Sequence, residues 1–278
     1  MFLRCGKVKL DLSQPKIMGI VNVTPDSFSD GGKHLSHQAA IIHAYRLIEE
    51  GANILDIGGE STRPGAAIVS EQEELDRVIP VIEGLQNIYV PISIDTYKPA
   101  VMRAALAAGA SMVNDINALQ ESEALVVLAK SDAAVCLMHK QGSPQNMQQS
   151  PQYIDVMDEV TTFLRLRLQA CVAAGIALDR LVIDPGFGFG KTLEHNFEIL
   201  RNLNEFIELG IPVLAGLSRK SMLGQVTGQA VEHRQAASVA AALIAVQRGA
   251  RILRVHDVRE TVDALKVWQA VNERILEK

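Results

Sequence analysis

The segment Asn53-Ile54-Leu55-Asp56-Ile57-Gly58-Gly59-Glu60 contains a short apolar run and closes with two glycines and an acidic residue. A segment with a helical pattern follows it. Short runs that are apolar on both faces are typical of parallel strands covered on each side. The run at residues 53–58 therefore predicts such a strand, and seven further runs predict others at residues 16–22, 90–95, 111–115, 133–139, 181–184, 211–216 and 251–256.

Longer helical segments separate these eight predicted strands. Ser70-Glu71-Gln72-Glu73 reads as a capping box at one helix start, and Pro99 suits the first turn of the next helix. Strands and helices that alternate in this way predict βαβ units around a parallel sheet. Eight pairs without a Pro/Ser-rich linker favour a single-domain (β/α)8 TIM barrel over residues 1–278, and a doubly wound sheet with extra units is the alternative.

The composition is that of an ordinary globular protein. Hydrophobic residues make up 48% of the 278 residues and charged residues 21%, which argues against disordered and collagen-like classes. The net charge of −5 gives no general attraction to nucleic acid or to an anionic membrane, so an anionic substrate requires a local cationic cluster. Cys5, Cys136 and Cys171 lack the spacing of a disulfide framework or a structural zinc site.

No stretch is long and apolar enough to predict a targeting or membrane segment. Charged residues interrupt the start of the chain, where a signal peptide would have an apolar run. The most apolar run elsewhere, residues 236–246, falls short of the roughly 20 residues that span a bilayer. We therefore expect a cytoplasmic protein. The same run suits either burial against the barrel or an oligomer interface.

Polar side chains end almost every predicted strand. In a barrel these ends converge on one face, where the active site lies. Each residue alone could be a helix cap or a satisfied strand end, but together they predict a polar mouth. The strand-end residues are Asn22, Asp56, Glu60, Asp95, Asn114, Asp115, His139, Asp184, Ser218, Lys220, Arg254 and His256. Two long connections at this face, residues 23–36 and 60–69, are either ordinary surface loops or lids that order over a substrate, and we favour lids.

The residue types divide this mouth into two chemical sides. Asp95, Asn114 and Asp184 are suited to the donor and acceptor edges of a flat heterocycle such as an aminopyrimidine. The cations are suited to phosphate, and they are Arg63, Lys220, Arg254 and His256. Lys220 could alternatively form a Schiff base. Asn22, with Asp26 and Asp30, could help hold Mg²⁺, which commonly takes few protein oxygens.

The segment at residues 184–192 imitates the end of a phosphate-binding P-loop. Gly190-Lys191-Thr192 matches the pattern, but Pro185 occupies the position where a P-loop requires glycine. We therefore reject nucleoside triphosphate binding there. The glycines instead predict positive φ angles and close backbone approach, with Phe187 and Phe189 packing or stacking.

Two segments, Gly19-Ile20-Val21-Asn22-Val23-Thr24-Pro25-Asp26-Ser27-Phe28-Ser29-Asp30-Gly31-Gly32 and Asp56-Ile57-Gly58-Gly59-Glu60-Ser61-Thr62-Arg63-Pro64-Gly65, resemble the signature segments of the dihydropteroate synthase family. The resemblance continues in order through Ile94-Asp95-Thr96, Val113-Asn114-Asp115, Leu137-Met138-His139, residues 184–191, Ser218-Arg219-Lys220-Ser221 and Arg254-Val255-His256-Asp257.

This resemblance implies a transferase of folate biosynthesis. Such an enzyme condenses (7,8-dihydropterin-6-yl)methyl diphosphate with 4-aminobenzoate (p-aminobenzoate) to 7,8-dihydropteroate and diphosphate, uses Mg²⁺, and is inhibited by sulfonamides. It also implies a homodimer. We expect a dissociative substitution in which diphosphate leaves without a covalent enzyme intermediate.

Residue roles follow from the same resemblance. Asp95, Asn114, Asp184 and Lys220 would hold the pterin, with Met138 packing in its pocket. Diphosphate and its metal would be handled by Asn22, Thr62, Arg63, Arg254 and His256. The p-aminobenzoate site would comprise Phe28, Thr62, Arg63, Pro64, Phe189, Lys220 and Ser221. The groups expected to be catalytic are Asp95, Asp184, Lys220, Arg254 and His256.

Three other functions fit parts of this sequence. A methyltetrahydrofolate-dependent methyltransferase would share the pterin carboxylates. It binds no diphosphate, so it would not require Arg63 and Arg254 as a diphosphate clamp. A non-catalytic pterin-binding subunit would be expected to lose loop motifs that are intact here. A class I aldolase would use Lys220, and borohydride trapping would reveal it.

Overall fold

A computed structural model describes residues 1–23, 32–61, 68–142 and 146–272 of the chain, with the side chains of residues 32–36 left undescribed. Eight parallel strands close into a barrel in the order β10-β3-β4-β5-β6-β7-β8-β9. The strands are β3 (Lys16–Asn22), β4 (Ile54–Gly58), β5 (Ile92–Asp95), β6 (Met112–Asp115), β7 (Ala134–Met138), β8 (Leu181–Asp184), β9 (Val213–Ala215) and β10 (Ala250–Val255). The predicted single-domain (β/α)8 barrel is thus confirmed.

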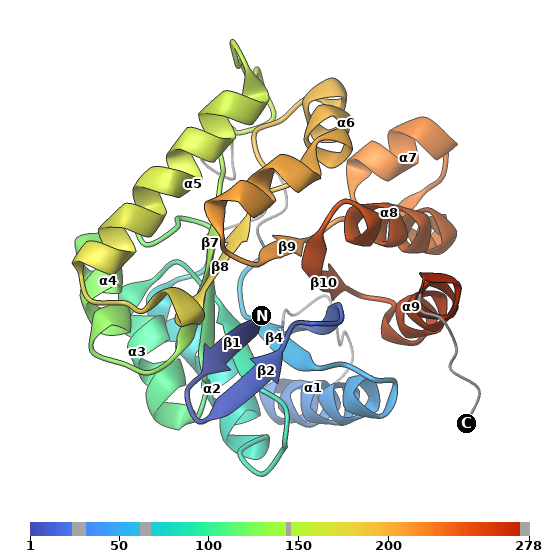
Figure 1. Ribbon diagram of the computed structural model, residues 1–278. Coiled ribbons are helices and arrows are strands. Elements are labelled where there is room, and N and C mark those ends of the chain that lie inside the picture. Colours follow the sequence, from blue (N-terminus) through green and yellow to red (C-terminus); the bar gives the residue numbers. More distant parts are fainter. Residues whose placement is uncertain (24–31, 62–67, 143–145, 273–278) are drawn as a thin grey trace, which may run out of the picture.

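Helices surround the strands, as Figure 1 shows. They are α1 (Gly32–Glu49), α2 (Glu71–Gly84), α3 (Pro99–Ala108), α4 (Ser122–Ala129), α5 (Val156–Ala173), α6 (Leu193–Arg201), α7 (Ser221–Thr227), α8 (Gln235–Gln247) and α9 (Val258–Asn272). Short 3₁₀ turns lie at Leu178–Arg180, Leu203–Leu209 and Val231–His233. Because α1 already begins at Gly32, the connection expected at residues 23–36 is shorter than the sequence predicted.

Local sequence explains several helix ends. The Ser70 hydroxyl accepts a hydrogen bond from the Glu73 amide at the start of α2, as the capping pattern predicts. The Glu73 carboxylate turns instead to Arg77, one turn along the helix. Pro99 opens α3, and Gly109 ends it in the left-handed conformation that glycine adopts without strain. These signals fix where α2 begins and where α3 begins and ends.

An N-terminal hairpin covers the opposite end of the barrel. Strands β1 (Phe2–Cys5) and β2 (Val8–Asp11) pair antiparallel and lie across the barrel in Figure 1. Leu3, Cys5 and Leu12 are completely buried in a cluster with inward-facing residues of the barrel. Those barrel residues are Met18, Ile54, Met112, Ala134, Cys136, Val182, Leu214 and Ile252. The sequence did not predict this hairpin, which forms the floor of the barrel.

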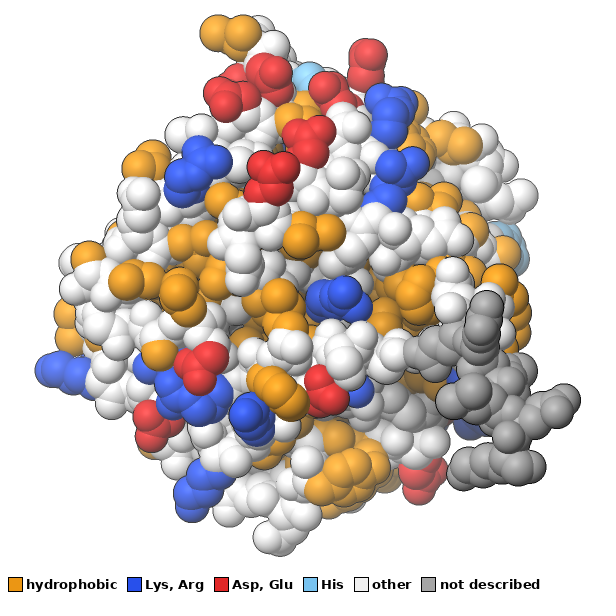
Figure 2. Space-filling view, viewed as in Figure 1, with side chains coloured by type: hydrophobic (Ala, Val, Ile, Leu, Met, Phe, Trp, Pro, Cys, Tyr) orange, Lys and Arg blue, Asp and Glu red, His pale blue; other side chains and the backbone are white. Residues whose placement is uncertain are grey.

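The outer surface is mixed in character. On the face shown in Figure 2, lysine and arginine side chains are interspersed with hydrophobic and acidic ones, and acidic side chains gather over α5 and α6. Within the described ranges no helix combines the length and apolar composition needed to cross a membrane.

The hairpin floor is expected to contribute measurably to stability. Leu3→Ala should lower the free energy of unfolding by about 2–5 kcal/mol, because it removes a completely buried side chain and leaves a cavity. Phe2→Ala is the matched control, since Phe2 is half exposed on the same strand, and it should change stability by less than about 1 kcal/mol. Urea unfolding measures both. Equal effects would show that the hairpin does not pack as a floor.

Candidate active site

The barrel brings most of the predicted polar strand ends together. Side chains alternate along a strand, so residues two apart share a face. Ile54 and Met112 face inward in the floor cluster, and Asp56 and Asn114 therefore face inward two positions later. The same rule directs further side chains into the mouth, namely Asn22, Asp95, Met138, Asp184 and Arg254. The inward placement predicted for polar strand ends is therefore confirmed for Asn22, Asp56, Asp95, Asn114, Asp184 and Arg254.

Arg254 lies between two carboxylates at one side of the mouth. Its Nε donates to Asp56 Oδ2 at 2.6 Å, and its Nη2 donates to Asp95 Oδ2 at 2.7 Å. Asn114 Nδ2 donates to the same Asp56 oxygen at 3.1 Å. Burial raises the pKa of Asp95 to about 7, although the Arg254 charge acts to lower it. This side therefore holds a guanidinium, an amide and two carboxylates in one connected network.

Asp184 and Lys220 form the other side of the mouth. Asp184 is buried, and its Oδ1 accepts a hydrogen bond from the Gly186 amide at 2.7 Å. The Lys220 ammonium donates to the Phe187 carbonyl and lies 4.5 Å from the centre of the Phe189 ring. Burial lowers the pKa of Lys220 to about 8, against the raising effect of the Asp184 carboxylate. Lys220 thus carries a positive charge that is readily changed near neutral pH.

The glycine-rich segment after β8 is shaped by its own backbone. Gly186 and Gly190 have φ angles of 70° and 63°, which confirms the predicted positive values. A side chain on Gly186 would collide with the His139 carbonyl, and one on Gly190 would collide with Gln141. The close approach is therefore to neighbouring backbone, and it requires glycine at both positions.

Lys191 is buried beneath this segment. Its Nζ lies 2.9 Å from His139 Nδ1, 3.0 Å from the Gly186 carbonyl and 3.2 Å from the Phe189 carbonyl. Burial lowers its pKa to about 7. Lys191 therefore ties the loop that carries Phe187 and Phe189 to the end of β7. The lysine that imitates a P-loop is a structural residue in this fold, which supports the rejection of a P-loop.

His256 and Ser221 lie beside the mouth on neighbouring elements. His256 Nδ1 lies 3.0 Å from the Ser218 hydroxyl, and Ser221 is the exposed first residue of α7. Arg219 has a φ of 58° and forms an ion pair with Asp257. Arg219 and Lys220 are neighbours in sequence but point to different partners. Arg219 binds Asp257, while Lys220 reaches the glycine-rich loop.

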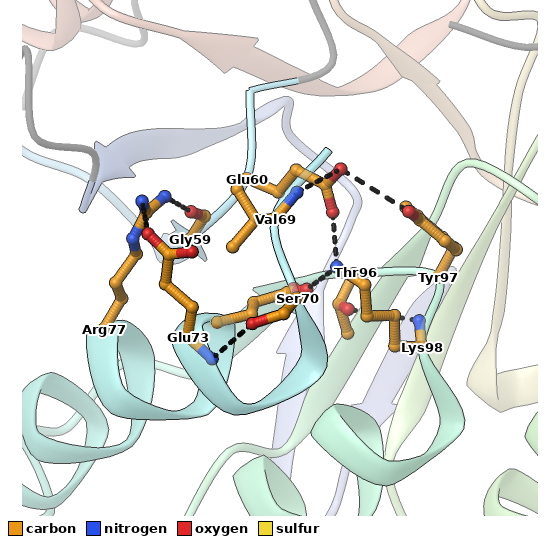
Figure 3. A network of polar contacts seen from close by, with 10 residues as sticks. Gly59, Glu60, Val69, Ser70, Glu73, Arg77, Thr96, Tyr97 and Lys98 are labelled. Carbon is orange, nitrogen blue, oxygen red and sulfur yellow. Dashed lines mark hydrogen bonds and ion pairs between the residues drawn. The ribbon is translucent and has the colours of Figure 1, made fainter. Parts of the chain in front are cut away.

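A polar network anchors the connection after β4 (Figure 3). The Glu60 carboxylate accepts from Lys98 Nζ at 2.5 Å and from the Val69 amide at 3.4 Å, so it joins the two ends of this connection. Lys98 also pairs with buried Glu74, and Arg77 donates to the Gly59 carbonyl at 2.6 Å. The predicted site residues Phe28, Thr62, Arg63 and Pro64, and the acidic Asp26 and Asp30, lie outside the described residues.

Asn22 is placed where a hard cation could be held. A Cβ built on Gly58 would lie 4.0 Å from Asn22 Oδ1 and 3.7 Å from Asp95 Oδ2, so these two oxygens flank the same glycine. The described part of the chain holds no group of three or more His, Cys, Asp or Glu side chains arranged for a metal. The amide oxygen of Asn22 is a hard donor of the kind that Mg²⁺ can take in addition to substrate phosphates and water.

Two residues of this site were not among the predicted site residues. Asp56 was recognised as a polar strand end, but its contacts with Arg254 and Asn114 join strands that are far apart in sequence. Lys191 appears in the sequence only within a segment that imitates the end of a P-loop, and no role in the site is predicted for it. The period of two along β4 was the available signal for Asp56, because it places Asp56 on the inward face with Ile54 and Gly58.

Comparisons with known proteins identify the family and the fold. Residues 18–256 match the family described as pterin binding enzyme. The Haemophilus influenzae dihydropteroate synthase is 55% identical over 94% of this chain and 95% of that protein.

Two solved structures also match. The Yersinia pestis dihydropteroate synthase with a sulfonamide drug has a TM-score of 0.93 and 52% identity, over 98% of this chain and 99% of that one. The Xanthomonas albilineans dihydropteroate synthase in complex with 7,8-dihydropteroate has a TM-score of 0.87 and 50% identity, over 98% of each chain. Both likenesses extend over the whole barrel.

The contacts of Lys191 give a stability prediction. Lys191→Met should lower the free energy of unfolding by about 1–3 kcal/mol, because buried acceptors at Gly186 and Phe189 lose their donor. Lys130→Met, at an exposed lysine after α4, is the control and should change it by less than about 0.5 kcal/mol. Chemical denaturation measures both variants. Unchanged stability in Lys191→Met would contradict a structural role for this lysine.

Proposed function

This chain belongs to the pterin binding enzyme family and is similar to its dihydropteroate synthases over nearly its whole length, and we propose that it catalyses their reaction. It condenses (7,8-dihydropterin-6-yl)methyl diphosphate with p-aminobenzoate to 7,8-dihydropteroate and diphosphate. The observation that carries this proposal is the mouth of the barrel, where inward carboxylates and an amide lie directly beside the two cations Arg254 and Lys220.

The pterin binds on the inward side chains. Asp95 and Asp184 accept N–H groups of the heterocycle, Asn114 offers its amide, and buried Met138 packs against the ring. Lys220 completes this set from the glycine-rich side. The support for this assignment is that these groups face one space from different strands of the barrel.

The leaving diphosphate binds at cations of the mouth. Arg254 and His256 hold its oxygens, and Arg63 is assigned to the same task although it lies outside the described residues. Asn22 would hold Mg²⁺ together with the phosphates, and the ion would neutralise charge that develops on the leaving group. The flanking oxygens at Gly58 support this placement.

Catalysis then depends on charge stabilisation. An aromatic amine is a weak nucleophile, so departure of diphosphate is the step that the site must assist. Arg254 stabilises the negative charge that grows on the leaving oxygens, while Asp95 and Asp184 stabilise the electron-deficient pterin. The substitution is dissociative and forms no bond to the enzyme.

The second substrate binds above the pterin. Phe189, Lys220 and Ser221 form its described part, and Phe28, Thr62, Arg63 and Pro64 are assigned to the remainder, outside the described residues. The carboxylate of p-aminobenzoate is received at the start of α7, where backbone N–H groups are unpaired by the helix. A sulfonamide would compete for this place.

The assembly is a homodimer in the cytoplasm. Leu243 of α8 and Val267, Trp268 and Val271 of α9 line a shallow surface groove, and Val267 and Val271 are largely exposed. A second copy of the chain covers such an apolar surface. Light scattering should give twice the monomer mass, and a monomeric mass at assay concentration would refute this assignment.

Turnover tests the function directly. The purified protein, given the pterin diphosphate, p-aminobenzoate and Mg²⁺, should release dihydropteroate and diphosphate in equal amounts. Chelation of Mg²⁺ should slow turnover strongly, and adding the ion back should restore it. Folded protein that makes no dihydropteroate would overturn the proposal. Borohydride trapping of Lys220 with a carbonyl substrate would instead support an aldolase.

The lowered pKa of Lys220 predicts a pH dependence. The charged form holds below its pKa of about 8, so kcat/KM should fall as the pH rises through that value. Lys220→Arg keeps its charge at all working pH values and should move the fall to higher pH, even if the maximum is lower. An identical alkaline limb in both proteins would assign the titration to another group.

A further inference from the structure

Asp56 connects two residues that reach it from opposite directions around the barrel. Its strand β4 lies two strands from β10, which carries Arg254, and two strands from β6, which carries Asn114. The side chain is completely buried, and its Oδ2 receives both Arg254 Nε and Asn114 Nδ2. Asp56 exposes none of its surface, whereas the pterin-binding Asp184 keeps 5% exposed, so we take Asp56 to act on ligands through these two neighbours.

The chemistry of this shared oxygen fixes the orientation of Asn114. A guanidinium has donors and no acceptor, so the Asp56 oxygen that faces Arg254 must accept. The same oxygen therefore accepts from Asn114, which must turn its NH₂ group toward Asp56. The carbonyl oxygen of the Asn114 amide is left as the group that meets a donor of the bound heterocycle.

Asp56 also fixes the plane of Arg254. Two contacts hold the guanidinium, one to Asp56 and one to Asp95. Asp95 is the more accessible of the two carboxylates, with 14% of its side chain exposed against none for Asp56. When pterin N–H groups occupy Asp95, the contact to Asp56 remains and keeps Arg254 in place.

Burial of the Asp56 carboxylate is not explained by stability. Its second oxygen, Oδ1, has no hydrogen-bond partner among the described residues, and such burial is unfavourable. Ile54 lies two residues before Asp56 on the same strand and faces the same interior, nearer the floor. The barrel therefore accepts an aliphatic side chain next to the position of Asp56. Packing alone therefore does not account for Asp56.

From these contacts, and resting on the function proposed above, we infer that Asp56 is a positioning residue. It orients Arg254 toward the leaving diphosphate and Asn114 toward the pterin at the same time. One carboxylate thus couples recognition of the heterocycle to stabilisation of the leaving group.

The test compares Asp56→Asn with Ser93→Ala. Ser93 is the register partner of Asp56 on β5 and is equally buried, yet no described contact joins it to Arg254 or Asn114. We expect Asp56→Asn to lower kcat at least about tenfold and to weaken binding of the bare pterin, with the KM for p-aminobenzoate changed less than about twofold. Ser93→Ala should keep all three within about twofold.

Two further measurements separate positioning from loss of fold. Urea unfolding gives the folded fraction, to which kcat is normalised. The variant pair Asp56→Asn and Asn114→Ala should lose pterin affinity non-additively, because the two residues share one hydrogen bond. Folded Asp56→Asn with wild-type kcat and pterin affinity, or additive losses in the pair, would overturn the inference.

The inference can fail independently of the proposed function. If the wild-type protein forms no dihydropteroate, the function fails, and NMR of the arginine Nε–H groups still tests Asp56 without any ligand. The Arg254 signal, identified by its loss in Arg254→Lys, should shift and exchange faster in Asp56→Asn. An unchanged signal would overturn the inference even in an active enzyme.

Discussion

Side chains on a strand alternate between two faces, and closing eight parallel strands into a ring gives every strand one inward face. Along β4 this face passes from Ile54 in the floor to Asp56 and then to Gly58 at the mouth. Along β10 it passes from Ile252 to Arg254. A shift of a single residue in either strand would turn its polar group outward. The site therefore depends on register more than on any one contact.

The mouth concentrates charge where water is scarce. Opposite charges compensate one another across the ring, as Arg254 does for Asp56 and Asp95. Burial brings the pKa of Asp95 up to about 7 and that of Lys220 down to about 8, so an acid and a base approach neutrality from opposite sides. Both groups therefore lie close to the pH at which their charge changes.

Much of this arrangement could be predicted from the sequence. The bounds of β3 and β8 agree with their apolar runs, because both strands are covered on each side and end in polar residues. The hairpin was not predicted, since β1 and β2 have four residues each and carry charges among their apolar positions. Their burial depends on the barrel floor, which has no signature within the hairpin itself.

The sequence predicts which residues lie in the site better than it predicts the contacts between them. Arg254 and Asp56 are 198 residues apart, and their meeting requires the ring to close. Lys191 carries the residue type of a phosphate-binding motif, and only the backbone path of the loop reveals that its ammonium points inward to carbonyls. Sequence pattern predicts which strand ends converge, while the partners of each charge are a property of the closed fold.

The hairpin floor restricts the route by which ligands reach the interior of the barrel. With Leu3, Cys5 and Leu12 packed under the strands, the described barrel is closed at its floor end. Every ligand must enter and leave by the same rim. Inward groups such as Asp184 are therefore reached from the rim, past the side chains that stand above them.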